Sequence, residues 1–588
     1  MKNLWYSLAS AVIISCSAPK EQAAPDFKAL MTDYHEAYLK LYPFTATSAG
    51  DNRYNDILPN NISVGYRNQL RDFYQGYQDK LKSVDRATLS EDDALSYDLL
   101  IYQCKTNLEG LKFNDHLMPI SQIQSMPLQV AQLAAGTGNQ PFKTVKDYDN
   151  WLSRLDGFVV WCDTAIANMK KGMATGYVIP KALALKVVPQ MASFDHGPVK
   201  EHLYYKPILN MPADFSAEDK ARLEKAYADM IEQKIIPTHQ KLKEFIENEY
   251  LPACRETSGI DAIPNGKEYY NFAIKRYTTT DLTADSIFAL GKAEVDRISK
   301  EMEAVKAQVG FKGDLKAFLE NLRTDKKLRP FKTGDDIVAY YNAIHEKMKP
   351  NLLKLFDKAP KTAFEVRRIE AYRERTTAAN YNAGSEDGTR PGIFYFPSPE
   401  PADYSIVGTE DLFLHEAIPG HHYQIMLKIE NKSLPDFRRF LNYGSYTEGW
   451  GLYTESLGKE LGLYTDPYQY FGMLTAEMHR AIRLVVDAGM HSQGWTREQA
   501  IQYSKDHEAA SEQNIISEIE RYMGNPGQAL SYKVGQLKIL GLRAKAEKEL
   551  GDKFNIKEFH NQVLDSGSLP LSTLEEKVDF WISKMKGL

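Results

Sequence analysis

The sequence predicts a mainly α-helical fold, and three observations lead to this prediction. Ser216 and Asp219 form a capping pattern that opens a long charged segment running towards Ile236. Thr283 can cap a second helix, in which apolar residues recur at helical spacing: Val295, Ile298, Met302 and Val305. The sequence shows no sustained run of alternating apolar and polar residues and no internal repeat. Residues 26–588 are therefore expected to form a single helical domain, a large bundle that divides into two lobes around a cleft.

The main interruption of the helical pattern is a segment dense in Gly and Pro from Asn382 to Ser405. Ile393 to Phe396 can form a short strand between turns, so we expect a minor β element near residues 390–397. One hypothesis is that the stretch starting at Arg390 pairs with an extended peptide by strand addition. A Pro-Gly turn packed on the body of the protein, or a plain surface loop, is the alternative.

The composition is that of an ordinary globular protein. The chain has 588 residues, of which 43% are hydrophobic and 26% are charged, and its formal net charge is -6. This length is ample for a large core that encloses a deep cleft. Acidic and basic residues are interleaved and no basic block occurs, which argues against a nucleic-acid partner.

The first 25 residues are predicted to export and anchor the protein. Lys2 precedes a short apolar stretch, Leu4 to Ile14, which is typical of a secretory signal and too short to span a bilayer. The ending Ile-Ile-Ser-Cys resembles a bacterial lipobox, in which Cys16 is acylated. Residues 1–15 are then the signal peptide, and residues 16–25 are the lipidated cysteine with a flexible tether. We expect an exported lipoprotein of the bacterial cell envelope, facing the periplasm from the outer membrane; an ordinary signal peptide with an incidental cysteine is the alternative.

The other cysteines, Cys104, Cys162 and Cys254, form no CxxC pair. We expect them to be small buried hydrophobic residues. The sequence therefore predicts neither a cysteine nucleophile nor a thiolate metal site.

The strongest functional signal is His-Glu-Ala-Ile-Pro-Gly-His-His, which starts at His415. In the helical zinc-hydrolase motif HExxH, two imidazoles one turn apart bind the metal and the glutamate lies beside the activated water. Glu416 has the position of that glutamate. Pro419, however, stands where the second histidine of the motif should be.

Helix geometry shows what such a site requires. On a regular helix, His421 would face about 240° round the axis from His415, and His422 would lie about 10.5 Å further along it. Zn–N bonds are only about 2.0–2.1 Å long, so neither histidine can share a zinc ion with His415 on a regular helix. A kinked turn at Pro419-Gly420 can bring either one back, and the choice between His421 and His422 stays open.

A third zinc ligand is available further along the chain. Glu448 follows His421 by 27 residues, enough for a helix to end and for a second helix to return alongside. Glu455 lies two turns after Glu448 on the same face. A solvated surface charge is the favoured interpretation of Glu455; a carboxylate that orients a zinc imidazole is the alternative, and Asp487 is another candidate for that role.

These segments resemble the bacterial family of unknown function numbered 885, which is similar to the helical gluzincin peptidases, such as angiotensin-converting enzyme and thimet oligopeptidase. Gluzincins carry His-Glu-x-Gly-His, so His415, Glu416 and His421 match with two inserted residues, and dipeptidyl peptidase III accepts one. The resemblance covers nearly the whole chain after the tether. It implies Glu448 as the third ligand of a single zinc ion.

The resemblance also implies further site residues. Gluzincins place a tyrosine over the oxyanion, and Tyr532, which follows a Gly-rich turn, is similar; a packed aromatic residue is the alternative. Arg521 can pair with a peptide carboxylate, although a salt bridge on a helix surface is the favoured interpretation.

A helix is predicted from Leu474 to His491. Arg483, Asp487 and His491 recur on it at four-residue spacing, so they share one face. We expect these three residues to form a buried ion-pair ladder that supports the cleft, rather than a second metal site.

The sequence thus predicts a zinc-dependent hydrolase, foremost a peptidase that cleaves small peptides with Glu416 as the general base. The first alternative is a zinc amidase or esterase that acts on another acyl substrate. The second is a non-catalytic lipoprotein that binds peptide or metal, in which the insertion at Pro419 has destroyed the site. The expected partners are a peptide or other small acyl substrate and, through the lipid, a membrane.

Overall fold

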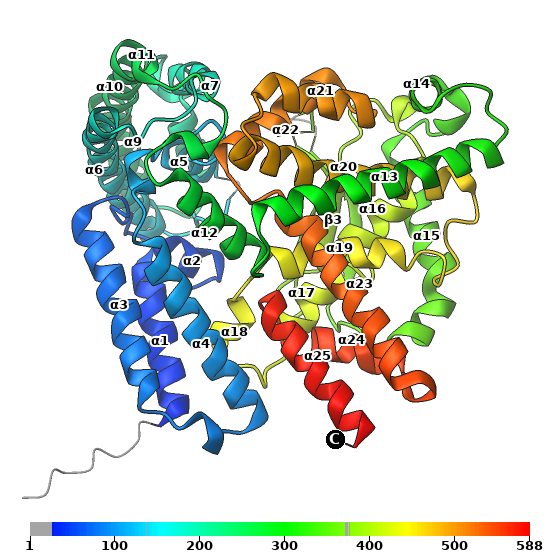
Figure 1. Cartoon of the computed structure of the whole chain (residues 1–588). Helices are drawn as coiled ribbons and strands as arrows, with labels where there is room; N and C mark the ends of the chain where they lie inside the picture. Colours follow the sequence, from blue (N-terminus) through cyan, green and yellow to red (C-terminus); the bar gives the residue numbers. More distant parts are fainter. Residues whose placement is uncertain (1–25, 137, 371–373, 376, 588) are drawn as a thin grey trace, which may run out of the picture.

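Helices dominate the computed structural model, which describes residues 26–136, 138–370, 374–375 and 377–587 (Figure 1). The prediction of a mainly α-helical fold is confirmed. The predicted signal peptide, residues 1–15, and the lipidated cysteine with its tether, residues 16–25, lie outside the described residues. No described helix is both long enough and apolar enough to span a lipid bilayer.

The first part of the chain forms the helices on the left of Figure 1. They are α1 (Phe27–Leu41), α2 (Pro43–Ser48), α3 (Val64–Lys82), α4 (Glu91–Gly110), α5 (Met126–Ala134), α6 (Val145–Thr175), α7 (Lys181–Ala192), α8 (Lys206–Leu209), α9 (Ala217–Met230), α10 (Ile236–Phe245) and α11 (Leu251–Ala253). Ser216 caps α9 as predicted, because its hydroxyl accepts a hydrogen bond from the Asp219 backbone N–H.

The segment opened by Ser216 runs further than the predicted end near Ile236. Two π-helical turns, Ile231–Ile235 and Ile246–Tyr250, link α9, α10 and α11 into one path. A proline follows shortly after each turn, Pro237 and Pro252. The proline ring clashes with a carbonyl of the preceding α-helical turn, and a wider turn relieves that clash, so the chain continues where a break would be expected.

The second part of the chain forms the helices on the right of Figure 1 and α12 between the two sides. They are α12 (Gly266–Thr278), α13 (Ala284–Gln308), α14 (Leu315–Thr324), α15 (Gly334–Leu355), α16 (Thr409–Glu416), α17 (His421–Glu430), α18 (Asp436–Phe440), α19 (Gly444–Ser456), α20 (Pro467–Ser492), α21 (Arg497–His507), α22 (Glu512–Gly524), α23 (Leu530–Leu550), α24 (Ile556–Leu564) and α25 (Leu571–Lys586). Thr283 caps α13 as predicted, and α20 begins seven residues before the predicted start at Leu474.

A small sheet lies between α15 and α16 in the sequence. Its strands are β1 (Phe364–Arg368), β2 (Asn380–Asn382) and β3 (Gly392–Phe396), in the order β1-β3-β2. Strand β3 is the predicted β element, and it pairs in parallel with β1 and antiparallel with β2. Both edges of β3 are occupied, so the hypothesis that a peptide adds to the stretch after Arg390 is wrong. Arg390 is exposed, and its guanidinium donates to the Ala383 carbonyl within the loop.

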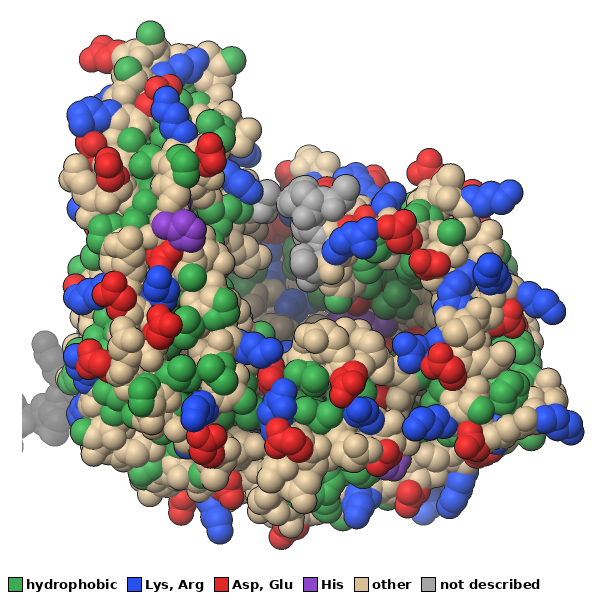
Figure 2. All heavy atoms as spheres, turned by 90° about the horizontal axis from the view of Figure 1, so that it is seen from above, with side chains coloured by type: hydrophobic (Ala, Val, Ile, Leu, Met, Phe, Trp, Pro, Cys, Tyr) green, Lys and Arg blue, Asp and Glu red, His purple; other side chains and the backbone are tan. Residues whose placement is uncertain are grey.

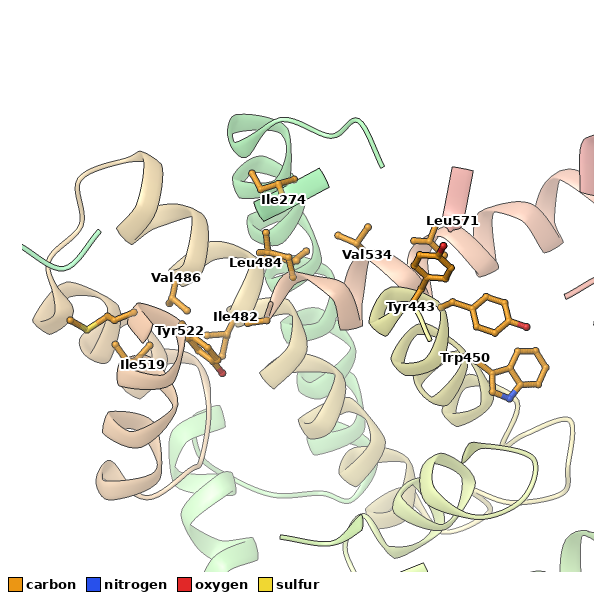
Figure 3. Close-up of a cluster of buried hydrophobic side chains, with 14 of the residues drawn as sticks. Ile274, Tyr443, Trp450, Ile482, Leu484, Val486, Ile519, Tyr522, Val534 and Leu571 are labelled. Carbon is orange, nitrogen blue, oxygen red and sulfur yellow. The ribbon is translucent and has the colours of Figure 1, made fainter. Parts of the chain in front are cut away.

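One continuous hydrophobic core joins the two sides of the molecule, from Phe27 in α1 to Ile582 in α25. Figure 3 shows part of it, with side chains from α19, α20, α22 and α23 packed together. Helices α19 and α23 approach closely because Gly449 faces Gly535: a side-chain carbon on Gly449 would lie 2.5 Å from the Gly535 Cα. The three cysteines Cys104, Cys162 and Cys254 are buried and unpaired, as predicted.

The surface is hollowed between the two sides of the molecule. Figure 2 shows this hollow from above, with histidine and basic side chains visible inside it. The sequence-predicted metal site is built by helices of the second side.

Candidate metal centre

The break between α16 and α17 turns two histidines towards each other. Helix α16 ends at Glu416 and α17 begins at His421, so the predicted interruption around Pro419-Gly420 is present. The ring centroids of His415 and His421 lie 4.7 Å apart. A side-chain carbon on Gly420 would lie 1.9 Å from the His415 carbonyl oxygen, so only glycine permits the chain to pass this close.

Helix α19 holds the break in place and supplies the third group. The Trp450 indole N–H donates to the Pro419 carbonyl at 2.9 Å, and the Thr454 hydroxyl donates to the Leu414 carbonyl at 2.9 Å. Both donors lie on α19 near Glu448. Helix α19 therefore fixes the direction of the chain around the break and also presents the Glu448 carboxylate to the two histidines.

The three predicted metal ligands converge. One Glu448 carboxylate oxygen lies 3.5 Å from the His415 Nε2 and 3.6 Å from the His421 Nε2. The ligand atoms of the three residues all lie within 4.8 Å of one another. Gly451 makes room for this arrangement, because a side-chain carbon there would lie 2.7 Å from the His415 ring.

The three groups fit a zinc ion in kind and in spacing. Ligand atoms bound at about 2.0–2.1 Å to a tetrahedral zinc ion lie roughly 3.3–3.4 Å from one another. The two measured histidine–glutamate separations are slightly longer, 3.5 and 3.6 Å. Two imidazoles and one carboxylate are the donor set of catalytic zinc sites that keep one position open.

Glu455 orients the imidazole ring of His415. Its carboxylate accepts a hydrogen bond from the His415 Nδ1 at 2.7 Å, which leaves Nε2 free to face the other two groups. Glu455 is only 1% exposed, so the interpretation of this residue as a solvated surface charge is wrong. Its alternative interpretation, a carboxylate that orients a ligating imidazole, agrees with the geometry.

The charges of the cluster stabilise one another. Burial lowers the pKa of His415, but the carboxylates of Glu448 and Glu455 raise it more strongly, to about 10. Burial raises the pKa of Glu448, but hydrogen bonds and charges from the two histidines hold it well below its usual range. Glu448 is therefore ionised, as a metal ligand must be, whereas His415 has to release its proton before it can bind a metal ion.

Glu416 lies beside the cluster without being part of it. The residue is 8% exposed, and its carboxylate forms no hydrogen bond or ion pair with any residue in the described part of the chain. A buried carboxylate without a protein partner is available to accept a proton from water.

His422 points away from the cluster. Its Nδ1 contacts the Tyr381 hydroxyl of β2 at 2.8 Å, and burial lowers its pKa to about 4. Of the two alternatives His421 and His422, the structure places His421 with His415 and Glu448, whereas His422 contacts the sheet through Tyr381.

Tyr532 lies on α23. The Arg483 guanidinium packs on its ring at 4.6 Å. Burial raises the pKa of the Tyr532 hydroxyl, and the Glu448 charge acts in the same direction. Within the described residues this hydroxyl has no hydrogen-bond partner, so it keeps a proton that it can donate.

The remaining predicted residues lie outside the cluster. Arg521 forms the favoured salt bridge on its own helix, to Glu518 at 2.9 Å. Asp487 accepts from the Tyr270 hydroxyl at 2.7 Å and from the Gly527 backbone N–H, so it does not orient a ligating histidine.

The predicted ion-pair ladder on α20 is wrong. Arg483 pairs with Glu518 on α22 at 3.0 Å instead of with Asp487. His491 is neutral at physiological pH, because burial lowers its pKa to about 3, and it contacts the backbone of Ile260 and Tyr522. The three residues share one face of α20 as predicted, but each one meets a different neighbouring element.

Sequence reasoning missed the supporting roles of Trp450, Thr454 and Tyr381. For Glu455 a signal was present: it lies seven residues after Glu448, on the same face of the helix, and that face must turn towards the two histidines if Glu448 is to approach them. Trp450 and Thr454 carry no comparable signal, because their partners are backbone carbonyls.

Comparison with known proteins gives a family and a fold. A family described as a bacterial protein of unknown function (DUF885) matches residues 43–578. No curated protein matches this chain. A crystal structure described as a "putative lipoprotein" from Colwellia psychrerythraea is 27% identical, with a TM-score of 0.86 over 95% of this chain and 99% of that chain. A second, described as a "putative lipoprotein of unknown function" from Shewanella oneidensis, is 20% identical, with a TM-score of 0.75 over 94% and 99% of the two chains, and shows the same fold.

Proposed function

We propose that this chain, which belongs to the DUF885 family of bacterial proteins of unknown function, is a zinc-dependent hydrolase that cleaves peptides. The observation that carries the proposal is the convergence of His415, His421 and Glu448 from three helices beside the unpartnered carboxylate of Glu416. A structural zinc site normally has four protein ligands. Among the described residues the cluster has three, which favours catalysis.

Each residue has a role in peptide hydrolysis. His415, His421 and Glu448 would hold a zinc ion, which would supply a Lewis acid to polarise the scissile carbonyl and lower the pKa of water. Glu416 accepts one proton from the attacking water and delivers it to the leaving amine as the C–N bond breaks. The Tyr532 hydroxyl donates a hydrogen bond to the carbonyl oxygen as negative charge develops on it.

We also infer that the protein is a lipoprotein anchored in the cell envelope through Cys16, facing the periplasm. The two similar structures are each described as a "putative lipoprotein", and the sequence around Cys16 has the form of a lipobox. Labelling with a radioactive fatty acid tests this directly: the wild-type chain should be labelled, and Cys16→Ser should not.

Metal analysis and peptide hydrolysis test the proposed function together. The purified protein should hold about one zinc ion, and Glu448→Ala should lose it. Glu416→Gln should keep the zinc ion but lose about 10²–10⁴-fold in turnover. Glu320→Gln, an exposed carboxylate on α14, is the matched control and should change neither value.

The same measurements separate the alternatives. Hydrolysis of small esters or non-peptide amides without cleavage of peptides would replace the peptidase by an amidase or esterase. Zinc binding without turnover on any acyl substrate would favour a non-catalytic metal-binding protein. Full turnover by Glu416→Gln would refute the role assigned to that carboxylate.

A further inference from the structure

A cavity of about 480 Å³ lies where α1, α3 and α4 meet α12 and the start of α19. Seven of its 19 lining residues are tyrosines: Tyr34, Tyr38, Tyr42, Tyr74, Tyr102, Tyr277 and Tyr443. A second cavity of about 320 Å³ shares part of this wall, including Tyr42 and Tyr74. Both volumes lie within the range of small-ligand sites.

The aromatic wall is held in a fixed arrangement. The Tyr42 and Tyr74 hydroxyls are hydrogen-bonded at 2.8 Å, and Gln103 donates to the Tyr443 hydroxyl at 2.7 Å. The rings of Tyr38 and Tyr42 stack with centroids 4.4 Å apart. A wall of this kind offers a planar apolar group a preformed surface at little entropic cost.

The charged side chains of the cavity determine whether it favours an anionic or a cationic ligand. Arg276 is the one Lys, Arg, Asp or Glu side chain among the described residues that line the larger cavity. It is exposed, and no carboxylate of the described residues pairs with it. His35 also lines the cavity, and burial lowers its pKa, so it carries no charge at neutral pH. Aromatic rings alone would also accept a cation, but the unpaired Arg276 disfavours a cation and favours an anion.

The cavity lies near the candidate metal centre along α19. Gly444 lines it and opens α19, and Glu448 follows one turn later, about 6 Å along the helix. A side-chain carbon on Gly444 would lie 3.8 Å from the Ser531 hydroxyl, next to Tyr532 in sequence. An extended peptide covers about 3.3–3.6 Å per residue, so two to four residues can span from the metal centre into the cavity.

We propose that this cavity binds an aromatic side chain of the peptide substrate, with Arg276 paired to a carboxylate adjacent to that side chain. The assignment rests on the proposed peptidase function, because it places the cavity along the path of the substrate. The substrate class is then a peptide that ends in an aromatic residue with a free carboxylate.

Binding to the full-length Glu416→Gln protein tests the proposal without turnover. The probes are Ala-Ala-Phe as the free acid, Ala-Ala-Phe amide and Ala-Ala-Ala, measured by titration calorimetry. We expect the free acid to bind about tenfold more tightly than the amide, which lacks the charge that pairs with Arg276, and about tenfold more tightly than Ala-Ala-Ala, which lacks the aromatic ring. Arg276→Met should remove the difference between acid and amide, and Arg276→Lys should restore part of it. Arg323→Met, an exposed arginine on α14, is the control for loss of charge.

Equal affinity for the three peptides would overturn the proposal, and so would an acid–amide difference in affinity that survives in Arg276→Met. Binding of 3-phenylpropanoate as tight as that of the free-acid peptide would also overturn it, because the cavity would then be a site for small aromatic acids. Equal affinities together with normal zinc content and turnover of the wild-type protein would refute this proposal alone. Absence of zinc and of turnover, with the affinity differences intact, would refute the proposed function alone.

Discussion

Replacement of Gly451 by alanine sets two opposing effects against each other. Gly451 lies inside α19, where alanine should stabilise the helix by about 0.5–1 kcal/mol. The added carbon, however, would lie 2.7 Å from the His415 Cε1, 2.9 Å from Nδ1 and 3.0 Å from Nε2. Such contacts are too short, so the imidazole or the helix must move.

The imidazole has little freedom to move. Its side chain is 6% exposed, and the bond to Glu455 at 2.7 Å holds its other nitrogen. Overpacking of this kind costs about 1–3 kcal/mol, which exceeds the gain in helix propensity. A shift of the ring also moves Nε2, and a zinc–ligand distance can deviate from its ideal value by only about 0.2 Å. We therefore expect Gly451→Ala to lower stability by about 1–2 kcal/mol and zinc affinity by about 10–100-fold, as when a supporting contact of a ligand is lost.

Gly541→Ala is the matched control, because Gly541 lies inside α23 with open space around the position of the added carbon. It should be stabilised by about 0.5–1 kcal/mol with no change in zinc affinity. Urea unfolding with a chelator present measures stability, and competition with a chromogenic chelator measures affinity. If Gly451→Ala gained stability like Gly541→Ala and bound zinc like the wild type, the close packing inferred for His415 would be refuted.

Three further predictions test the neighbours of the cluster. Glu455→Ala should lower zinc affinity by about 10–100-fold in a chelator competition, and an unchanged affinity would show that His415 needs no orienting carboxylate. His421→Ala should lose the zinc ion, whereas His422→Ala should keep it and lower stability by about 1 kcal/mol through loss of the Tyr381 contact. Elemental analysis of zinc distinguishes the two variants, and loss of zinc from His422→Ala alone would exchange the roles of the two histidines. Burial raises the pKa of Asp487 to about 7, so the folded state favours the protonated form of this carboxyl group. The contribution of Asp487 to the free energy of unfolding is therefore fully present below about pH 4 and is lost as the pH rises through 7. Asp487→Asn should therefore flatten the pH dependence of urea unfolding between pH 4 and 8, by on the order of 4 kcal/mol, and a curve parallel to the wild type would contradict the shift.

Local chemistry let the sequence determine the fold class and the place of the break. Ser216 and Thr283 cap helices because capping depends on a few adjacent backbone N–H groups. Pro419 and Gly420 interrupt the helix for equally local reasons, a missing N–H and a position where a side chain would collide with a carbonyl. The residue types and their spacing nominated His415 and Glu448 and left His421 and His422 as alternatives for the remaining ligand.

Tertiary contacts decided what local chemistry could not. The direction of the chain after the break depends on Trp450 and Thr454, two distant residues that bond to its backbone, and that direction selects His421 over His422. The burial of Glu455 and the separate partners of Arg483 and Asp487 likewise depend on which helices pack together. Spacing along a helix places side chains on a face, but only the packed neighbours determine whether that face meets water, a metal ligand or an opposite charge.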